Sequence, residues 1–229
     1  MSTIVIAPEV DRPPLEIPGG IKTLTAFRKW AFSDSFPETG RIDYVDGRIE
    51  VDMAAEDLFV HNLPQSELIR MLGNFVRERR LGWVFCDGAR ISCPNRALSV
   101  EPDVVFLSHD AYESGRATFR KSKSGSHKGS VEIVGPVDLV VEIISDSSVR
   151  KDTKVLPETY FRAGVQELWL LDCRRNDVSF EIYARNARKF KTAKVDSNGF
   201  RRSGVLGAAF RLTRQPSHPH MRRCSLEVR

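Results

Sequence analysis

A nearly continuous apolar run that is interrupted by an acid is the feature that most constrains the fold. Over residues 137–144 the chain is apolar except at Asp138 and Glu142. Such a strand is normally covered on both faces, so the run predicts the middle of a sheet between two other layers. An ionised carboxylate there is costly unless another group pairs with it. Glu142 therefore predicts either a bound metal ion or an arginine partner inside the core.

A second acid stands at the mouth of another apolar strand. Asp103 precedes the strand predicted over residues 104–107, and Pro102 before it removes a backbone donor and favours an extended entry. Two acids at the edges of neighbouring strands can share Mg²⁺, which prefers oxygen ligands and keeps several waters. Such an ion can polarise a phosphate and help to generate hydroxide. The residues alone leave two interpretations open, a catalytic metal site and a pair of structural salt bridges.

The composition is that of an ordinary globular protein, since 41% of the 229 residues are hydrophobic and 28% are charged. The apolar runs are too short to cross a bilayer, and residues 1–14 lack the basic start and apolar stretch of a signal peptide. We therefore expect a cytoplasmic protein with no membrane partner. The net charge of +5 favours a polyanionic partner such as nucleic acid, although charge alone does not establish one.

The spacing of the cysteines predicts neither a zinc site nor a disulfide framework. No two of them form a Cys-x-x-Cys pair, which a zinc ribbon would need. Without a secretion signal, structural disulfides are not expected either. We predict ordinary free thiols at Cys86, Cys93, Cys173 and Cys224.

The first half of the chain predicts helices and hairpins in alternation. Residues 1–20 are rich in proline and predict a flexible lead-in. The alternating segments 41–45 and 48–51 flank Asp46-Gly47, which is typical of a two-residue hairpin turn. The remaining predicted elements are a helix capped by Thr23 or Thr25 and running to about Ser33, a helix over 63–80, a hairpin of 83–86 with 89–93, and a strand over 104–107.

The second half predicts a long basic loop, further strands and a tail. The loop, residues 114–130, offers Lys121, Lys123 and Lys128 as candidate phosphate contacts. A helix is predicted over 157–163 and ends at Gly164, with strands over 167–171, 178–183 and 189–195. Residues 213–229 are rich in Arg, Pro and His and predict a disordered basic tail. The sequence therefore predicts one α/β domain over residues 21–212, with a mixed sheet flanked by helices.

Several motifs occur in a fixed order over residues 23–212. They are Tyr44-Val45-Asp46-Gly47-Arg48-Ile49, His61, Pro102-Asp103-Val104-Val105-Phe106, the segment 138–145, and the segment 152–172 with its Tyr160, Ala163-Gly164-Val165, Glu167-Leu168-Trp169 and Leu171-Asp172. In this order and spacing the chain resembles the Uma-type restriction endonuclease family, within the PD-(D/E)XK nuclease superfamily. The resemblance covers nearly the whole predicted domain, and the last segment is its most specific part.

The resemblance implies a restriction-endonuclease-like core, with a central mixed β-sheet flanked by helices. It also implies a bound Mg²⁺, with Mn²⁺ as an alternative. By this likeness the ion is held by Asp103, by Glu142 and by the backbone carbonyl of Ile143. His61 is implied to lie near the site, although a histidine at a helix start can equally bond a nearby loop.

The chain departs from the family pattern at the lysine. The superfamily motif has lysine two residues after the second acid, where this chain has Ile144, and the Uma-type pattern has it in the following helix, where this chain has Leu156. Lys154 stands two residues earlier and is the predicted catalytic lysine, with a solvated side chain as the alternative and Lys151 as a weaker substitute. The displaced lysine leaves open a relative that binds nucleic acid without cutting it.

The leading hypothesis is a Mg²⁺-dependent endonuclease that acts on DNA. Its predicted catalytic residues are Asp103, Glu142, Lys154 and His61. Many nucleases that cut both strands act as dimers, so a homodimer is one expectation. The alternatives are a non-catalytic nucleic-acid-binding relative, and a structural or interaction domain in which the two acids pair with arginines.

Overall fold

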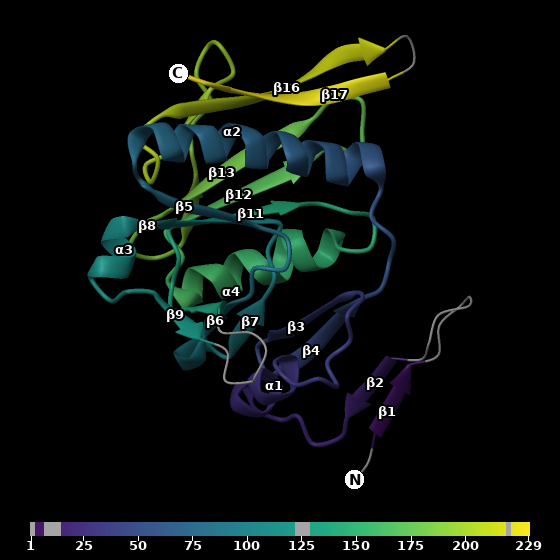
Figure 1. Ribbon diagram of the computed structural model, residues 1–229. Coiled ribbons are helices and arrows are strands. Elements are labelled where there is room, and N and C mark those ends of the chain that lie inside the picture. Colours follow the sequence, from purple (N-terminus) through teal and green to yellow (C-terminus); the bar gives the residue numbers. More distant parts are fainter. Residues whose placement is uncertain (1–2, 7–14, 122–128, 219–220) are drawn as a thin grey trace.

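Two six-stranded mixed sheets form separate layers in the computed structural model, which describes residues 3–6, 15–121, 129–218 and 221–229 (Figure 1). The central sheet has the order β14–β13–β12–β11–β8–β5 and the outer sheet the order β4–β3–β7–β6–β10–β9. The central strands are β5 (Gly82–Cys86), β8 (Val104–Ser108), β11 (Leu139–Ile143), β12 (Glu167–Asp172), β13 (Ser179–Arg185) and β14 (Phe190–Thr192). The outer strands are β3 (Arg41–Val45), β4 (Arg48–Asp52), β6 (Ile91–Cys93), β7 (Leu98–Val100), β9 (Thr118–Lys121) and β10 (Ser130–Val134). The mixed α/β class predicted from the sequence is confirmed.

β11 lies in the interior of the central sheet because both of its faces are apolar. It runs parallel to β12 and antiparallel to β8. Val141 packs in the core shared with α2 (Leu63–Arg79), whereas Val140 packs in the core shared with α4 (Leu156–Ala163). Helices therefore cover both faces of this sheet (Figure 1). The strand predicted over residues 137–144, the helix predicted over 63–80 and the hairpin predicted at 41–51 are all present.

The C-terminal segment forms a β-hairpin, so the prediction of a disordered tail over 213–229 is wrong for its described part. β16 (Ala209–His218) pairs antiparallel with β17 (Met221–Val228), and β15 (Arg201–Arg202) extends this small sheet. Cys224 and Leu226 alternate with polar neighbours and are buried in the core beside α2. The high arginine and proline content concealed this alternation. α2 therefore lies between the central sheet and the hairpin (Figure 1).

The described residues before the first helix also belong to the folded structure. β1 (Thr3–Ile6) pairs with β2 (Leu15–Pro18). Leu15 and Ile17 are buried in a cluster with residues of α1 (Leu24–Ala31) and β3. The predicted flexible lead-in therefore contributes a strand to the core. Buried residues extend past both predicted domain limits, residues 21 and 212.

The predicted hairpin of residues 83–86 with 89–93 does not form. β5 pairs with β8 in the central sheet, whereas β6 pairs with β7 and β10 in the outer sheet. The turn at Asp87-Gly88 therefore carries the chain from one sheet to the other. Gly88 has a φ of +79°, a left-handed conformation that glycine adopts without steric cost.

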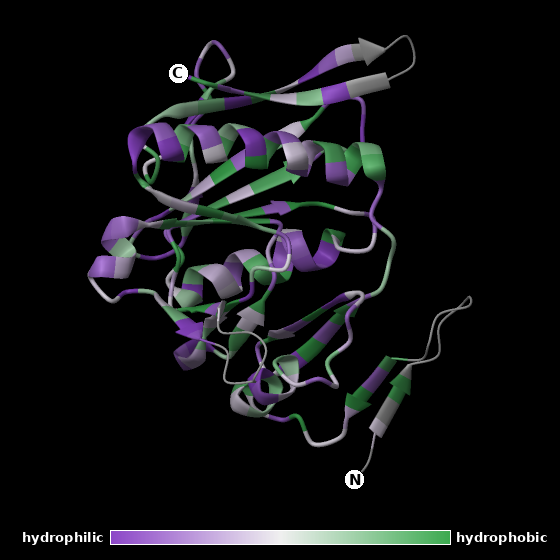
Figure 2. Cartoon of the chain, viewed as in Figure 1, coloured by the Kyte–Doolittle hydropathy of each residue, from purple (hydrophilic) through white to green (hydrophobic). Residues whose placement is uncertain are grey.

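The remaining elements are short, and part of the predicted basic loop is strand. They are α3 (His109–Glu113), a 3₁₀ turn at Pro94–Arg96, and π-helical turns at Leu58–Asn62 and Lys151–Val155. β9 and β10 occupy the ends of the predicted loop, with Lys121 exposed; Lys123 and Lys128 lie outside the described residues. Figure 2 shows hydrophilic and hydrophobic residues interspersed along α2. Among the described helices, none combines the length and apolar character that a membrane span needs.

The packing of the C-terminal hairpin predicts a large effect of substitution in β16. The ring of Phe210 is 1% exposed, with its centroid 4.8 Å from Trp169 and 5.5 Å from Phe75. Phe210→Ala should lower the free energy of unfolding in urea by about 3–5 kcal/mol, because it leaves a cavity. Val195→Ala, at a side chain that is 55% exposed, should change it by less than about 0.5 kcal/mol. Equal stability of both variants would contradict the docking of the hairpin.

Candidate functional site

Asp103 and Glu142 lie on one face of the central sheet, at the ends of adjacent strands. β8 and β11 are antiparallel with Val104 opposite Val141, and each acid comes one residue beyond that pair. Opposite side chains in an antiparallel pair point to the same face. Glu142 lies two residues after Val140 in β11, so its side chain points to the same face, the one that α4 covers. The two acids therefore meet beneath α4, where both are buried.

The charge of Asp103 is well compensated. Its Oδ1 accepts a hydrogen bond from Arg41 at 2.8 Å, and its Oδ2 accepts one from the Ile143 N–H at 2.6 Å. The Nε2 of His61 lies 3.5 Å from the same Oδ2. Burial raises the pKa of Asp103, but His61, Arg41 and the Ile143 N–H outweigh it and leave that pKa lowered. Asp103 is therefore ionised at neutral pH.

Glu142 stands in the opposite electrostatic environment. The hydroxyl of Tyr160, on α4, donates to its Oε1. Burial and the negative charges of Asp103 and Asp152 raise the pKa of Glu142 well above its ordinary value, and the nearby cations offset only part of this effect. These surroundings favour the protonated form of Glu142, and added positive charge would favour the carboxylate. A cation beside it would take the place of that proton.

The segment before α4 decides which lysine reaches the acids. A π-helical turn, Lys151–Val155, extends the helix toward them. Along the extended helix, every fourth residue from Asp152 is buried, which gives a buried face made of Asp152, Leu156 and Tyr160. Lys154 lies two residues from Asp152, on the opposite face, and is exposed. The structure therefore does not bring Lys154 to Asp103 and Glu142, and this expected placement is corrected.

Lys151, expected only as a weaker substitute for Lys154, is the lysine that faces the buried acids. Its Nζ lies 3.3 Å from Oδ2 of Asp43. Burial lowers the pKa of Lys151, but the negative charges of Asp43, Glu142 and Asp152 outweigh it and raise the net value. Burial also raises the pKa of Asp152 to about 6. The helix start predicted at residue 157 hid this arrangement, because it left residues 151–155 in a loop.

Three residues that the sequence analysis did not single out complete the cluster: Arg41, Asp43 and Glu56. Arg41 touches Asp103, and its guanidinium also lies 3.5 Å from Oε1 of Glu56 and 3.6 Å from Oδ1 of Asp87. Asp43 is buried two residues along the same strand. The alternation within residues 41–45 was the available signal, because it places Arg41 and Asp43 on one side of the strand.

One group of side chains has the spacing of a metal site. Glu56, His61 and Asp103 offer ligand atoms that all lie within 4.8 Å of one another. The buried Nδ1 of His61 is 3.3 Å from Oε2 of Glu56 but has no hydrogen-bond partner among the described residues. An oxygen-rich set with one imidazole suits a divalent cation. Glu142 is not part of this closely spaced group, although the charge of Asp103 acts on it.

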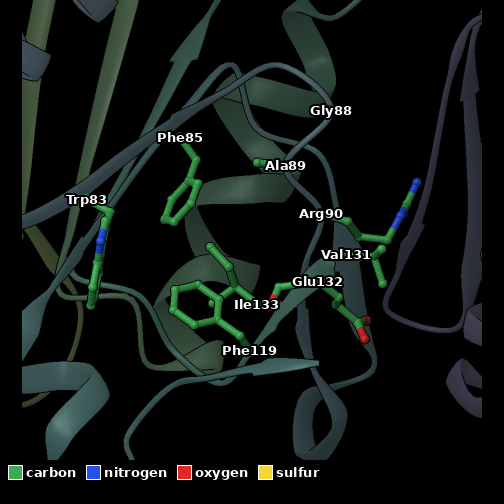
Figure 3. A pocket seen from close by; sticks show the side chains of 10 residues that line it. Trp83, Phe85, Gly88, Ala89, Arg90, Phe119, Val131, Glu132 and Ile133 are labelled. Atoms are coloured by element: carbon green, nitrogen blue, oxygen red, sulfur yellow. The ribbon is translucent and has the colours of Figure 1, made fainter. Parts of the chain in front are cut away.

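A cleft of about 370 Å³ opens over this group and is lined by Arg41, Glu56, His61 and Ile143, among others. Gly88 lines both this cleft and a second hollow of about 410 Å³. Figure 3 shows the second hollow between the rings of Trp83, Phe85 and Phe119.

The second hollow is chemically different from the cleft. The side chains of Arg90 and Glu132 point away from its aromatic rings (Figure 3). The carboxylate of Glu132 is held by Arg28, at 2.6 and 2.7 Å. The hollow therefore presents an apolar wall and no free carboxylate, so the acidic cleft is the candidate site for a cation.

The sequence pattern of the Uma2 family, described as "Putative restriction endonuclease", matches residues 24–214. The chain belongs to the Uma2 family. The resemblance inferred from the motifs is thereby confirmed. The matched region contains every member of the acidic cluster, so the site lies wholly inside the Uma2 domain. Among curated proteins, none matches the chain.

A solved structure supports the fold of this Uma2 chain. It is described as a putative nuclease belonging to DUF820 from Anabaena variabilis, and it shares 19% identity with a TM-score of 0.57. The likeness covers 81% of this chain and 90% of that one. At this identity the likeness shows the fold alone, and it confirms the restriction-endonuclease-like core. Both descriptions concern nucleases, and this coarse class is what the comparisons support.

The raised pKa of Glu142 predicts that the carboxylate destabilises the metal-free protein at high pH. As the pH rises above the ordinary glutamate range, the unfolded chain releases this proton while the folded chain retains it, so stability is lost. Glu142→Gln removes that loss and should stabilise the chelator-treated protein at pH 8 by on the order of 1 kcal/mol. The difference should vanish near pH 4.

Urea unfolding at both pH values, in the presence of a chelator, measures this difference. Glu158→Gln is the matched control, because Glu158 is exposed on the same helix. Its stability should follow that of the unmodified chain at both pH values. A Glu142→Gln protein that is less stable than the unmodified chain at pH 8 would show that Glu142 is not strained by its surroundings.

Proposed function

We propose that the chain is a Mg²⁺-dependent endonuclease that hydrolyses DNA phosphodiester bonds, with Mn²⁺ as an alternative ion. One observation carries the proposal. Among the described residues of the cluster, carboxylates outnumber permanent cations, since the buried Asp43, Asp103, Glu142 and Asp152 and the exposed Glu56 face Arg41 and Lys151. Burial of uncompensated negative charge is costly. A divalent cation compensates it, and the family assignment points to the same chemistry.

The proposed ligands of such an ion come from both acids and their neighbours. Asp103, Glu142 and the backbone carbonyl of Ile143 are the proposed ligands, and Ile143 lines the cleft. Glu56 and His61 stand close enough to Asp103 to share in the coordination. A bound Mg²⁺ supplies a Lewis acid for the phosphate and lowers the pKa of a coordinated water.

Arg41 is the residue that must yield when Asp103 takes up a cation. Its hydrogen bond to Asp103 occupies one carboxylate oxygen. The same guanidinium lies within 3.6 Å of Glu56 and Asp87. After a small movement, Arg41 can donate its hydrogen bonds to these two carboxylates instead. In that position Arg41 faces the cleft, where a guanidinium can pair with a phosphate through two parallel hydrogen bonds.

Lys151 is the proposed catalytic lysine, in place of Lys154. Its raised pKa keeps it charged at neutral pH, so it acts as a cation and not as a general base. Beside Asp43 and Glu142 it can orient the attacking water and offset negative charge that develops on the phosphoryl oxygens. His61 contributes from the far side of Asp103 and holds that carboxylate in place.

DNA is the proposed partner, because the chain is basic and the family is described as restriction endonucleases. A homodimer would place two such clefts on opposite strands of one duplex. Dimer formation and cytoplasmic location both stay predictions.

The ion pair between Arg41 and Asp103 favours a second candidate, a relative that does not cut. In that case Arg41 is the permanent partner of Asp103, and the cleft binds nucleic acid or another chain without metal. Calorimetry with Mg²⁺ separates the two functions before any cleavage assay.

We expect the unmodified chain to bind Mg²⁺ or Mn²⁺ in isothermal titration calorimetry. Asp103→Asn and Glu142→Gln should each weaken binding roughly 100-fold or more, because each removes a ligand. Glu158→Gln should bind as the unmodified chain does. Affinity should fall as the pH drops through about 6, since protonation of Asp152 then removes negative charge that favours a cation in the cluster. Absence of binding by the unmodified chain would remove the nuclease proposal.

Paired lysine variants test which lysine acts in catalysis. Lys151→Gln should lower kcat/KM for DNA cleavage by about 10²–10³, the usual effect of losing one preorganised electrostatic contact. Lys154→Gln should stay within about threefold of the unmodified chain, as an exposed substitution does. Plasmid nicking and cleavage of a labelled single strand, both in Mg²⁺, measure the rates. The reverse order of effects would restore Lys154 as the catalytic residue, and metal binding without cleavage of any substrate would favour the non-cutting relative.

A further inference from the structure

Two cysteines lie side by side although they are far apart in the sequence. Cys173 follows β12 directly, and Cys224 lies in β17. Their sulfur atoms are 3.3 Å apart, and 51 residues separate them along the chain. Cys173 is fully buried, whereas Cys224 is 5% exposed. The two thiols therefore form a contact between the C-terminal hairpin and the end of a central strand.

A half-buried arginine stands beside the two thiols. Arg214 is opposite Cys224 in the β16–β17 register, and its guanidinium donates to the backbone carbonyl of Cys173. Its Nε is buried and has no hydrogen-bond partner among the described residues. The hydrogen bond between the two thiols lowers the pKa of Cys224 to about 7, with help from the charge of Arg214, although burial acts in the opposite direction. Cys224 is therefore the thiol that more readily becomes a thiolate.

We propose that Cys173 and Cys224 form a modification site, at which two-electron oxidation produces an intrachain disulfide. With hydrogen peroxide as the oxidant, the Cys224 thiolate attacks one peroxide oxygen, and the O–O bond breaks. Hydroxide leaves and takes up a proton to become water.

The second step uses the neighbouring thiol. The sulfur of Cys173 attacks the sulfenic acid on Cys224, the S–S bond forms and the S–O bond breaks. The departing hydroxide takes the Cys173 proton and becomes the second water. The two thiols together lose two electrons, and the peroxide gains them.

The cross-link requires little movement of the chain. Bonded sulfur atoms lie about 2.05 Å apart, so the thiols, now at 3.3 Å, approach by roughly 1 Å. The bond joins β17 to the end of β12, the strand next to β11 in the central sheet. It closes a long loop, which stabilises the fold chiefly by restricting the unfolded chain. This inference rests on the packing of the hairpin and is independent of the proposed nuclease activity.

The test uses the full chain, purified in the reduced state and then treated with hydrogen peroxide. Digestion without reduction, followed by mass spectrometry, should yield one linked peptide pair that contains Cys173 and Cys224. The midpoint of thermal unfolding should rise by roughly 5–15 °C and return to its original value with dithiothreitol. Amide hydrogen exchange within β17 should slow after oxidation.

Matched cysteine variants assign the effect. Cys173→Ser and Cys224→Ser should each abolish the linked peptide and the thermal shift. Cys86→Ser, at the exposed cysteine, and Cys93→Ser, at a thiol whose pKa burial raises to about 12, should retain both. If a serine variant at 173 or 224 fails to fold, the peptide map of the unmodified chain decides alone. The proposal would be overturned if, after peroxide treatment, Cys173 and Cys224 remained free thiols or formed disulfides with other cysteines.

Discussion

Burial of several carboxylates beneath α4 is the constraint on which the arrangement of the site depends. The register of β8 and β11 places Asp103 and Glu142 on one face, and no single arginine can neutralise both. Each neighbouring feature reduces part of the resulting repulsion. Arg41 pairs with Asp103, and Lys151 adds positive charge near Glu142. The elements that supply these two cations come from different layers, so the site exists only when the outer sheet and α4 pack against the central sheet.

The sequence predicted the elements whose patterns are local. Three features can each be recognised from residues that are close together in the sequence. They are the apolar run of β11, the long amphipathic stripe of α2 and the Asp46-Gly47 turn. Strand pairing between distant segments could not be predicted in this way. The alternating residues of β5 and β6 are equally compatible with a hairpin, and only the completed sheets show that they pair elsewhere. The C-terminal hairpin was missed because the prediction followed the Arg, Pro and His content of this segment, which suggested disorder. The alternation of buried and polar residues, which is typical of a strand, was not used.

The candidate site was predictable for its acids and not for its cations. An acid inside an apolar strand is conspicuous, and Asp103 and Glu142 were found for that reason. Lys151 and Lys154 look alike in sequence, since both precede the same helix. A single π-helical turn decides between them, because it fixes which residues share a face with Tyr160. Arg41 was equally hidden, since an arginine at the start of a surface hairpin is ordinarily solvated.

The contact between Tyr160 and Glu142 explains how α4 is coupled to the chemistry. The tyrosine hydroxyl donates to one carboxylate oxygen and satisfies only part of the hydrogen-bonding capacity of that group. A proton and a cation compete at such a group, because a carboxylate binds a metal ion in its deprotonated form. Because the pKa of Glu142 is raised, proton release would accompany cation binding at this group. The raised pKa of Glu142 thus reflects a buried acid with little positive charge around it, a pattern that clusters at functional sites.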